Sequence, residues 1–79
     1  MNIDIETKTK IDRWRSKAEV FLENRIKCFI KTIDGSYHSA DVIFVGQDWL
    51  VVNDFIKKEK FRVWWLDILL FEEYKEKVE

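Results

Sequence analysis

Apolar positions near the start of the chain recur every three or four residues, the period of an α-helix that buries one side. The positions of this apolar stripe are Ile11, Trp14, Ala18, Phe21 and Leu22. Thr9 followed by Asp12 has the spacing of a capping box, and Asn24 tolerates the left-handed geometry in which many helices end. The pattern predicts a helix over residues 9–24 that begins near Lys10.

The period then changes to two, as in strands whose side chains alternate between the faces of a sheet. Ile26, Cys28 and Ile30 share one face of the first predicted strand. An Asp34-Gly35 pair follows, which favours a type I′ hairpin turn with positive φ at both central residues. The sequence therefore predicts a tight hairpin at this point.

The second strand is predicted over residues 36–45, with Ala40, Val42 and Phe44 on one face. The later strands are predicted over residues 49–53, 61–66 and 68–71, and residues 72–79 form a charged tail. Five strands with tight turns are too few for a comfortable sandwich. We expect a mainly β chain in which residues 25–71 form a bent antiparallel SH3-like barrel, with the helix over one open end.

Length and aromatic content indicate how many domains the chain forms and how many of its large side chains its core can hold. A chain of 79 residues is expected to form one domain, and a domain this small buries only about 60% of its unfolded surface. Four tryptophans exceed what such a core needs, which indicates a partner surface. Trp64 and Trp65 are adjacent, and adjacent strand residues face opposite sides, so we expect one of them to lie outside the core.

Charge is unevenly distributed although the net charge is only -1. The segment Lys8–Lys31 holds eight basic and three acidic residues, whereas Asp67–Glu79 holds five acidic and two basic residues. Such asymmetry fits an oriented anionic partner, but it also fits a solvated helix face and a charged tail. Nucleic-acid footprints usually carry a more basic balance, which favours the second interpretation.

Candidate chemistry is sparse. Cys28 is the only cysteine, so no internal disulfide can form, and a buried, unreactive thiol in a reducing compartment is expected. His38 is the only histidine, and with Asp41 and Cys28 it supplies too few ligands for a metal site. We therefore expect His38 on the surface of a strand, with no metal and no cofactor.

An enzymatic function and a secreted or membrane location are disfavoured. Neither a Gly-rich phosphate loop nor a paired-carboxylate motif is present, so we predict that the protein is not an enzyme. The start of the chain lacks the apolar region of a signal peptide, and the apolar run at residues 63–71 is too short to span a bilayer. A cytoplasmic protein without membrane contact is expected.

The order of these elements resembles that of the Sm-like proteins, the broad group that includes Lsm proteins and bacterial Hfq. The segments that carry the resemblance are Phe21-Leu22, residues 26–30 (IKCFI), Asp34-Gly35, residues 40–53 (ADVIFVGQDWLVVN) and residues 63–68 (VWWLDI). It covers roughly residues 18–71. The resemblance implies rings that bind RNA, in which the fourth strand of one subunit pairs with the fifth strand of its neighbour.

Residue by residue, the match to the family's RNA contacts is partial. The family's turn Asp, its base-contacting Asn and its Arg-Gly pair fall on Gly46, Leu50 and Trp65-Leu66. Gln47 matches the Gln that follows the turn in the Hfq type, and Arg25 represents the basic rim. RNA could still stack on exposed tryptophans, because stacking tolerates any base.

Two functions from different classes follow. The first is an Sm-like RNA or single-stranded nucleic-acid binding protein that forms a homo-oligomer through its fourth and fifth strands, which are edges that need pairing. Its expected contact residues are Arg25, Gln47, Trp49, Trp64 and Trp65. The alternative is an SH3-like protein–protein interaction module, or a structural subunit, that binds no nucleic acid.

Overall fold

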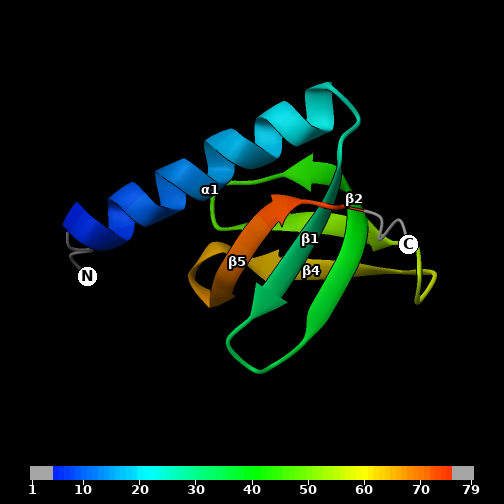
Figure 1. Cartoon of the computed structure of the whole chain (residues 1–79). Helices are drawn as coiled ribbons and strands as arrows, with labels where there is room; N and C mark the ends of the chain where they lie inside the picture. The colour runs from blue at the N-terminus through cyan, green and yellow to red at the C-terminus, as the bar shows by residue number, and fades with distance from the viewer. Residues whose placement is uncertain (1–4, 76–79) are drawn as a thin grey trace.

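A computed structural model describes residues 5–75, which form one helix followed by five strands (Figure 1). The elements are α1 (Ile5–Glu23), β1 (Lys27–Thr32), β2 (Tyr37–Val45), β3 (Trp49–Asp54), β4 (Glu59–Trp64), the 3-10 turn η1 (Trp65–Asp67) and β5 (Ile68–Glu73). The strands form one antiparallel sheet in the order β4-β3-β2-β1-β5. The prediction of a mainly β chain with an N-terminal helix is confirmed.

The helix begins earlier than predicted. It already includes Ile5, and the hydroxyl of Thr9 donates to the Ile5 carbonyl at 2.8 Å. Thr9 is therefore an interior residue bonded back to the preceding turn, and the predicted capping box is wrong. At the other end the Asn24 amide donates to the Val20 carbonyl at 2.9 Å, and it is Arg25 that adopts the left-handed geometry, with φ 54°.

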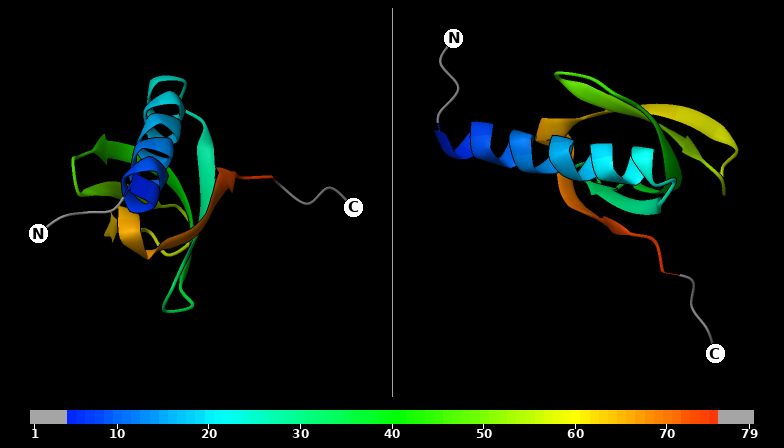
Figure 2. Two further views of the ribbon diagram at one scale, coloured as in Figure 1. Left: turned by 90° about the vertical axis from the view of Figure 1, so that its left-hand side faces the viewer. Right: turned by 90° about the horizontal axis from the view of Figure 1, so that it is seen from above.

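The apolar stripe of α1 packs on the concave side of the sheet (Figure 2). Ala18 and Phe21 are buried, while Ile11 and Trp14 are partly buried against the core. The Phe71 ring of β5 meets the Phe21 ring edge-on, with centroids 5.3 Å apart, and the Trp14 ring at 6.0 Å. The helical period thus identified four of the residues that join α1 to the sheet, whereas Leu22, the fifth predicted position, is 37% exposed.

Strand alternation holds in β1 but is interrupted in β2. Cys28 and Ile30 point into the core as predicted. In β2 the register with β3 shifts between Val42 and Phe44, so Phe44 is 51% exposed and Val45 packs against the core instead. The prediction that Phe44 shares a face with Ala40 and Val42 is wrong, because a bulge adds a residue and reverses the alternation beyond it.

The turn between β1 and β2 is a hairpin of another type than predicted. Within it only Gly35 has positive φ, at 86°. The Gly35 N–H donates to the Thr32 carbonyl at 3.0 Å, and the Asp34 carboxylate accepts the Thr32 hydroxyl and the Ser36 N–H. This is a three-residue hairpin loop with glycine in the left-handed position. A type I′ turn is instead a two-residue loop with positive φ at both central residues.

The last two strands are shifted or longer than predicted. β4 is predicted over residues 61–66, but it begins at Glu59 and ends at Trp64. β5 continues to Glu73, so the first two residues of the predicted tail belong to a strand. The tail's residues 76–79 lie outside the described range. Main-chain pairing with β1 explains the extension, because the Tyr74 N–H still donates to the Lys27 carbonyl at 2.8 Å.

The predicted closure into a barrel is not observed, because the sheet is open between β4 and β5 over the described residues. Its strand order begins with β4 and ends with β5, and η1 carries the chain between them. The turn is fastened to neighbouring loops: the Trp65 N–H donates to the Asp48 carbonyl at 3.2 Å, and the Asp67 carbonyl accepts the Ile33 N–H at 2.8 Å. The sheet is bent, but its two edges remain unpaired.

Candidate functional site

Two tryptophans and an arginine form a cluster on the outer face of β3 and β4. Trp49 and Trp64 are cross-strand partners, with ring centroids 5.0 Å apart at an interplanar angle of 65°. The Arg62 guanidinium carbon lies 5.1 Å from the Trp49 centroid and 5.5 Å from that of Trp64. Trp64 is 43% exposed. The Trp49–Arg62–Trp64 cluster therefore offers an aromatic surface and a positive charge to a ligand.

Strand geometry explains why these three side chains meet. Residues directly opposite each other in an antiparallel pair have Cβ atoms ~5 Å apart, so cross-strand aromatics are in contact. Arg62 precedes Trp64 by two residues and therefore shares its face. A guanidinium within about 6 Å of an aromatic centroid is attracted to the ring. Sequence reasoning missed Arg62, because only the register of β3 with β4 shows which cation lies beside the tryptophans.

Trp65 does not belong to this cluster. It is 1% exposed, and its indole N–H donates to the Gly46 carbonyl at 3.2 Å. Trp65 was among the expected contact residues, but its side chain fills the core and is not one of the exposed tryptophans on which a base could stack. Gly46 must stay small at this corner: a Cβ there would lie 2.9 Å from both the Phe44 ring and the Trp49 carbonyl oxygen. The expectation that one residue of the Trp64-Trp65 pair lies outside the core is confirmed.

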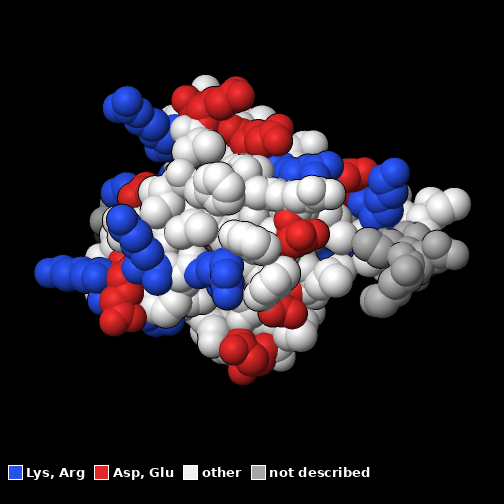
Figure 3. Space-filling model, turned by 180° about the vertical axis from the view of Figure 1, so that it is seen from behind, with Lys and Arg blue, Asp and Glu red and all other residues white. Residues whose placement is uncertain are grey.

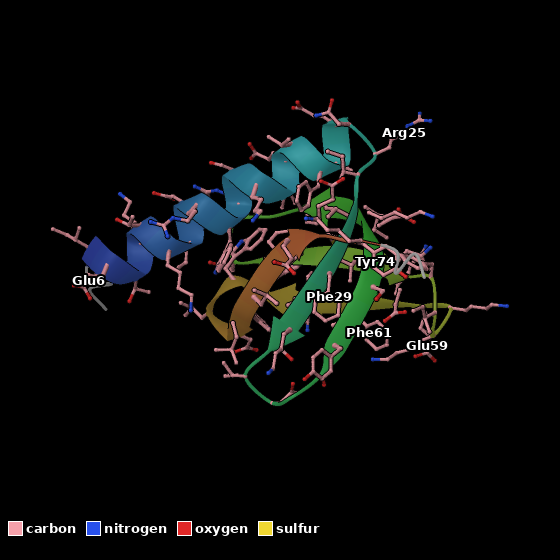
Figure 4. The ribbon with its side chains drawn as sticks, in the orientation of Figure 1. Glu6, Arg25, Phe29, Glu59, Phe61 and Tyr74 are labelled. Atoms are coloured by element: carbon pink, nitrogen blue, oxygen red, sulfur yellow. The ribbon has the colours of Figure 1, made fainter. Side chains whose placement is uncertain are left out.

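The two predicted polar contacts lie at different ends of the sheet. Gln47 is exposed in the β2–β3 turn, close in sequence to Trp49 at the start of β3. Arg25 is exposed between α1 and β1, and its side chain points away from the sheet (Figure 4). The register places the start of β1 beside Asp41 and hence near Asn53, toward the far end of β3. Arg25 and the tryptophans are therefore not one compact site.

His38 is buried, which contradicts the predicted surface position. It is 6% exposed, its Nδ1 lies 3.3 Å from Oδ2 of Asp54, and its ring centroid is 4.6 Å from that of Phe61. The misprediction has a physical cause: His38 shares the inward face of β2 with Ala40, and a buried carboxylate satisfies its imidazole.

Asp54 is the centre of this buried polar group. Its Oδ1 accepts the backbone N–H groups of Ile56 and Lys57 at 2.9 and 2.8 Å. Burial opposes ionisation of the carboxyl, but the hydrogen bonds from Lys57, His38 and Ile56 outweigh it and lower the pKa of Asp54. The carboxylate therefore holds the β3–β4 turn in place, which is a structural role.

Cys28 is buried, as predicted. Burial, together with the negative charge of Asp41, raises the pKa of the Cys28 thiol to about 12. The thiolate is the reactive form of cysteine, so this side chain has no nucleophilic role in the folded protein.

No family model matches the sequence, and no curated protein matches it. The interpretation of the site therefore rests on its geometry. Among residues 5–75, no helix has the length and apolarity needed to cross a membrane. Over the same range, no group of three His, Cys, Asp or Glu side chains is arranged to hold a metal ion.

Proposed function

We propose that the protein is an Sm-like, self-associating protein that binds RNA or single-stranded nucleic acid on the Trp49–Arg62–Trp64 cluster. The observation that carries this proposal is the exposed Trp64 ring, which meets the Trp49 ring edge-on and is flanked by Arg62. Stacking on such a ring contributes ~1–3 kcal/mol per base and tolerates any sequence. An adjacent guanidinium can contact the phosphate of the same nucleotide.

The fold supports the Sm-like part of the proposal. A helix followed by five antiparallel strands, with a sharp corner after β4, is the element order on which the resemblance rests. The open sheet leaves β4 and β5 as edges, as the family's mode of assembly requires. Exposed apolar side chains lie on these strands and on η1 between them: Trp64 on β4, Leu66 on η1, and Leu69 and Leu70 on β5. Unpaired edges with such side chains favour pairing with another chain.

Self-association and ligand binding are compatible on this surface. Hydrogen bonds between strand edges lie in the plane of the sheet, whereas side chains stand roughly perpendicular to it. If β4 of one subunit pairs with β5 of the next, the outer face that carries Arg62 and Trp64 remains accessible. The assembly would then present one aromatic cluster per subunit.

The test of nucleic-acid binding is fluorescence anisotropy with labelled oligouridine and oligoadenosine at low and moderate salt. Trp64→Ala should weaken binding by ~5- to 150-fold, the equivalent of 1–3 kcal/mol per stacked base, and binding should fall as salt rises. The matched control is Tyr37→Ala, because Tyr37 is 50% exposed with Lys31 5.5 Å from its ring but lies on β2. Its affinity should equal that of the wild type.

Two results would contradict the proposal: no binding by the wild type even at low salt, or equal weakening by Trp64→Ala and Tyr37→Ala. The alternative, an SH3-like protein-interaction module, is favoured by the near-zero net charge and by the exposed aromatic pair, which also suits a proline-rich peptide. The same assay with a labelled PxxP peptide separates the alternatives, because saturable peptide binding without RNA binding supports only the module.

Self-association has its own measurement, light scattering across a range of protein concentrations. Leu69→Lys places a charge on β5, where Leu69 is 53% exposed, and should shift the mass toward the monomer. Ile56→Lys is the control, because Ile56 is 64% exposed but lies in the β3–β4 turn. A wild-type monomer at high concentration would remove this part of the proposal.

A further inference from the structure

A second aromatic pair lies at the end of β3 opposite to Trp49. Phe55, which directly follows β3, and Tyr74, which directly follows β5, have ring centroids 5.2 Å apart at an angle of 86°. The Lys27 Nζ lies 5.0 Å from the Phe55 centroid. The Phe55–Tyr74 pair with Lys27 thus repeats the composition of the Trp49–Arg62–Trp64 cluster: two rings and a cation.

Main-chain hydrogen bonds fix the position of this pair. The Phe55 N–H donates to the Ser39 carbonyl at 3.0 Å, and the Tyr74 N–H donates to the Lys27 carbonyl at 2.8 Å. A hollow of about 510 Å³ opens beside the rings, and Arg25 contributes to its wall. Figure 4 shows Arg25 above Tyr74 at this end of the sheet. The rings and cations are therefore held around a space that a ligand can enter.

The two aromatic sites share one face of the molecule. Residues of a strand alternate between faces, so Trp49, Val51 and Asn53 point outward together, and each is half-buried while Leu50 and Val52 are buried. Phe55 lies in the turn beyond β3, where its ring contacts Lys27. Lys27 is exposed on β1, and its partner Asp41 on β2 is opposite Asn53, so this contact places the ring on the same face. At ~3.4 Å per residue, the six residues from Trp49 to Phe55 separate the two sites by roughly 20 Å.

Cations line the space between them. In the β3–β4 register Arg62 is opposite Val51 and Lys60 is opposite Asn53, so both basic side chains lie along the outward row of β4. Figure 3 shows the molecule from behind, with Lys and Arg more frequent toward the left and with Asp and Glu side chains interspersed among uncharged ones in the middle. Asp41, opposite Asn53 on β2, and Glu73, in the wall of the hollow, are the acidic neighbours. The basic residues Arg25, Lys27, Lys60 and Arg62 outnumber them.

We propose that the outer face of β3 is a track for one nucleic-acid strand, which stacks one base on Trp64 and another on the Phe55–Tyr74 pair. Arg62, Lys60 and Lys27 face the phosphates between the two bases. This inference rests on the proposed function and adds its ligand class: an oligonucleotide long enough to span both sites, in place of a mononucleotide. Single-strand binding proteins with the OB fold, another small β architecture, contact about 4–16 nucleotides per domain.

The test is a length series of oligouridines, from the dinucleotide to the octamer, measured by anisotropy with the full chain. Wild-type affinity should rise steeply once a ligand reaches both sites, because the second contact is then intramolecular. Tyr74→Leu combined with Lys27→Gln should lower the affinity for the octamer by at least ~5-fold, the lower bound for one stacked base. The same double variant should bind the dinucleotide as the wild type does.

Trp64→Ala should instead weaken binding at every length. Tyr74→Phe keeps the ring and should keep the wild-type length dependence, and a thermal melt of each variant verifies that it is folded. If the folded double variant binds the octamer like the wild type while Trp64→Ala does not, the track is wrong and the proposed function stands. If the wild type binds no oligonucleotide of any length, both fail.

Discussion

Trp64 and Trp65 are neighbours in the chain but differ completely in surroundings. Trp65 is 1% exposed with its indole N–H hydrogen-bonded, whereas Trp64 is 43% exposed beside Arg62. The chemistry of the two side chains is the same, so the difference comes from strand alternation and the corner at η1. The inner face of β3, β4 and η1 holds the fold together, and the outer face offers rings and cations to a ligand.

The sharpest test of this division is Trp65→Ala. Removing a buried indole leaves a cavity, and such truncations cost ~3–5 kcal/mol, so the free energy of unfolding should fall by that amount in chemical denaturation. In a chain of 79 residues this is a large part of a typical total of ~5–15 kcal/mol. Trp65→Phe retains most of the packing and should lose less. A loss below 1 kcal/mol for the alanine variant would mean that the core does not depend on this ring.

Asp54 provides the next largest effect, on the inner face of β3. Asp54→Ala leaves the N–H groups of Ile56 and Lys57 and the imidazole of His38 without their acceptor. An unsatisfied buried donor costs ~1–3 kcal/mol, so the free energy of unfolding should drop by about that much or more. Asn53→Ala, on the outer face, is the matched control and should change it by no more than ~0.5 kcal/mol. Equal losses would contradict the division between the faces.

Acid should weaken the fold through two carboxyl groups. The Thr32 hydroxyl and the Ser36 N–H lower the pKa of Asp34 from 3.8 to about 2, and hydrogen bonds lower that of Asp54 against the effect of its burial. A lowered pKa stabilises the folded state above the unfolded pKa, and this stabilisation is lost as pH falls through the folded value. The midpoint of urea unfolding should therefore decline below about pH 4, where carboxyls in the unfolded chain take up protons. Asp54→Asn should show a shallower decline, and an identical pH profile would contradict the assignment.

On the outer face, Trp64→Ala should change stability by less than ~1 kcal/mol, because cation–π contacts at exposed sites contribute ~0.5–1 kcal/mol. Thermal melting of this variant beside Trp65→Ala compares the two neighbours directly. A comparable drop in melting temperature for both would show that Trp64 is also a core residue.

The smallest effect concerns Cys28, which lies on the inner face of β1. Since its thiol is buried with a pKa of about 12, a thiol reagent at pH 8 should modify it only when the protein opens. The modification rate of the native protein should therefore rise on addition of urea. A fast reaction in native buffer, at the rate of a free thiol, would place Cys28 on the surface.

Periodicity made the helix stripe and the alternation of β1 predictable, because burial of one face leaves a repeating pattern in the sequence. Local features could not be predicted from this periodicity. The bulge after Val42 and the continuation of α1 back to Ile5 depend on pairing and packing that no spacing encodes. The His38–Asp54 contact joins residues sixteen positions apart, so the histidine on its own suggested a surface position.

The candidate site was predictable only in part, for the same reason. Trp49 and Trp64 could be named from composition and alternation, but Arg62 and the Phe55–Tyr74 pair become part of a site only through register. Arg62 reaches the tryptophans because the β3–β4 register places Trp64 opposite Trp49 and Arg62 opposite Val51. Phe55 and Tyr74 come from the ends of different strands. Trp65 was predicted to be a contact residue although it alternates with the exposed Trp64, and it is buried together with Val63.

Two basic residues occupy backbone conformations that suit glycine better: Arg25 and Lys58, with φ of 54° and 59°. For a side chain with a Cβ this geometry costs about 1 kcal/mol or more. Glycine at either position would relieve that strain and remove a surface cation at the same time. Relief of backbone strain and retention of surface charge are therefore opposed at these two positions, and a variant selected for heat resistance alone would be expected to lose positive charge there.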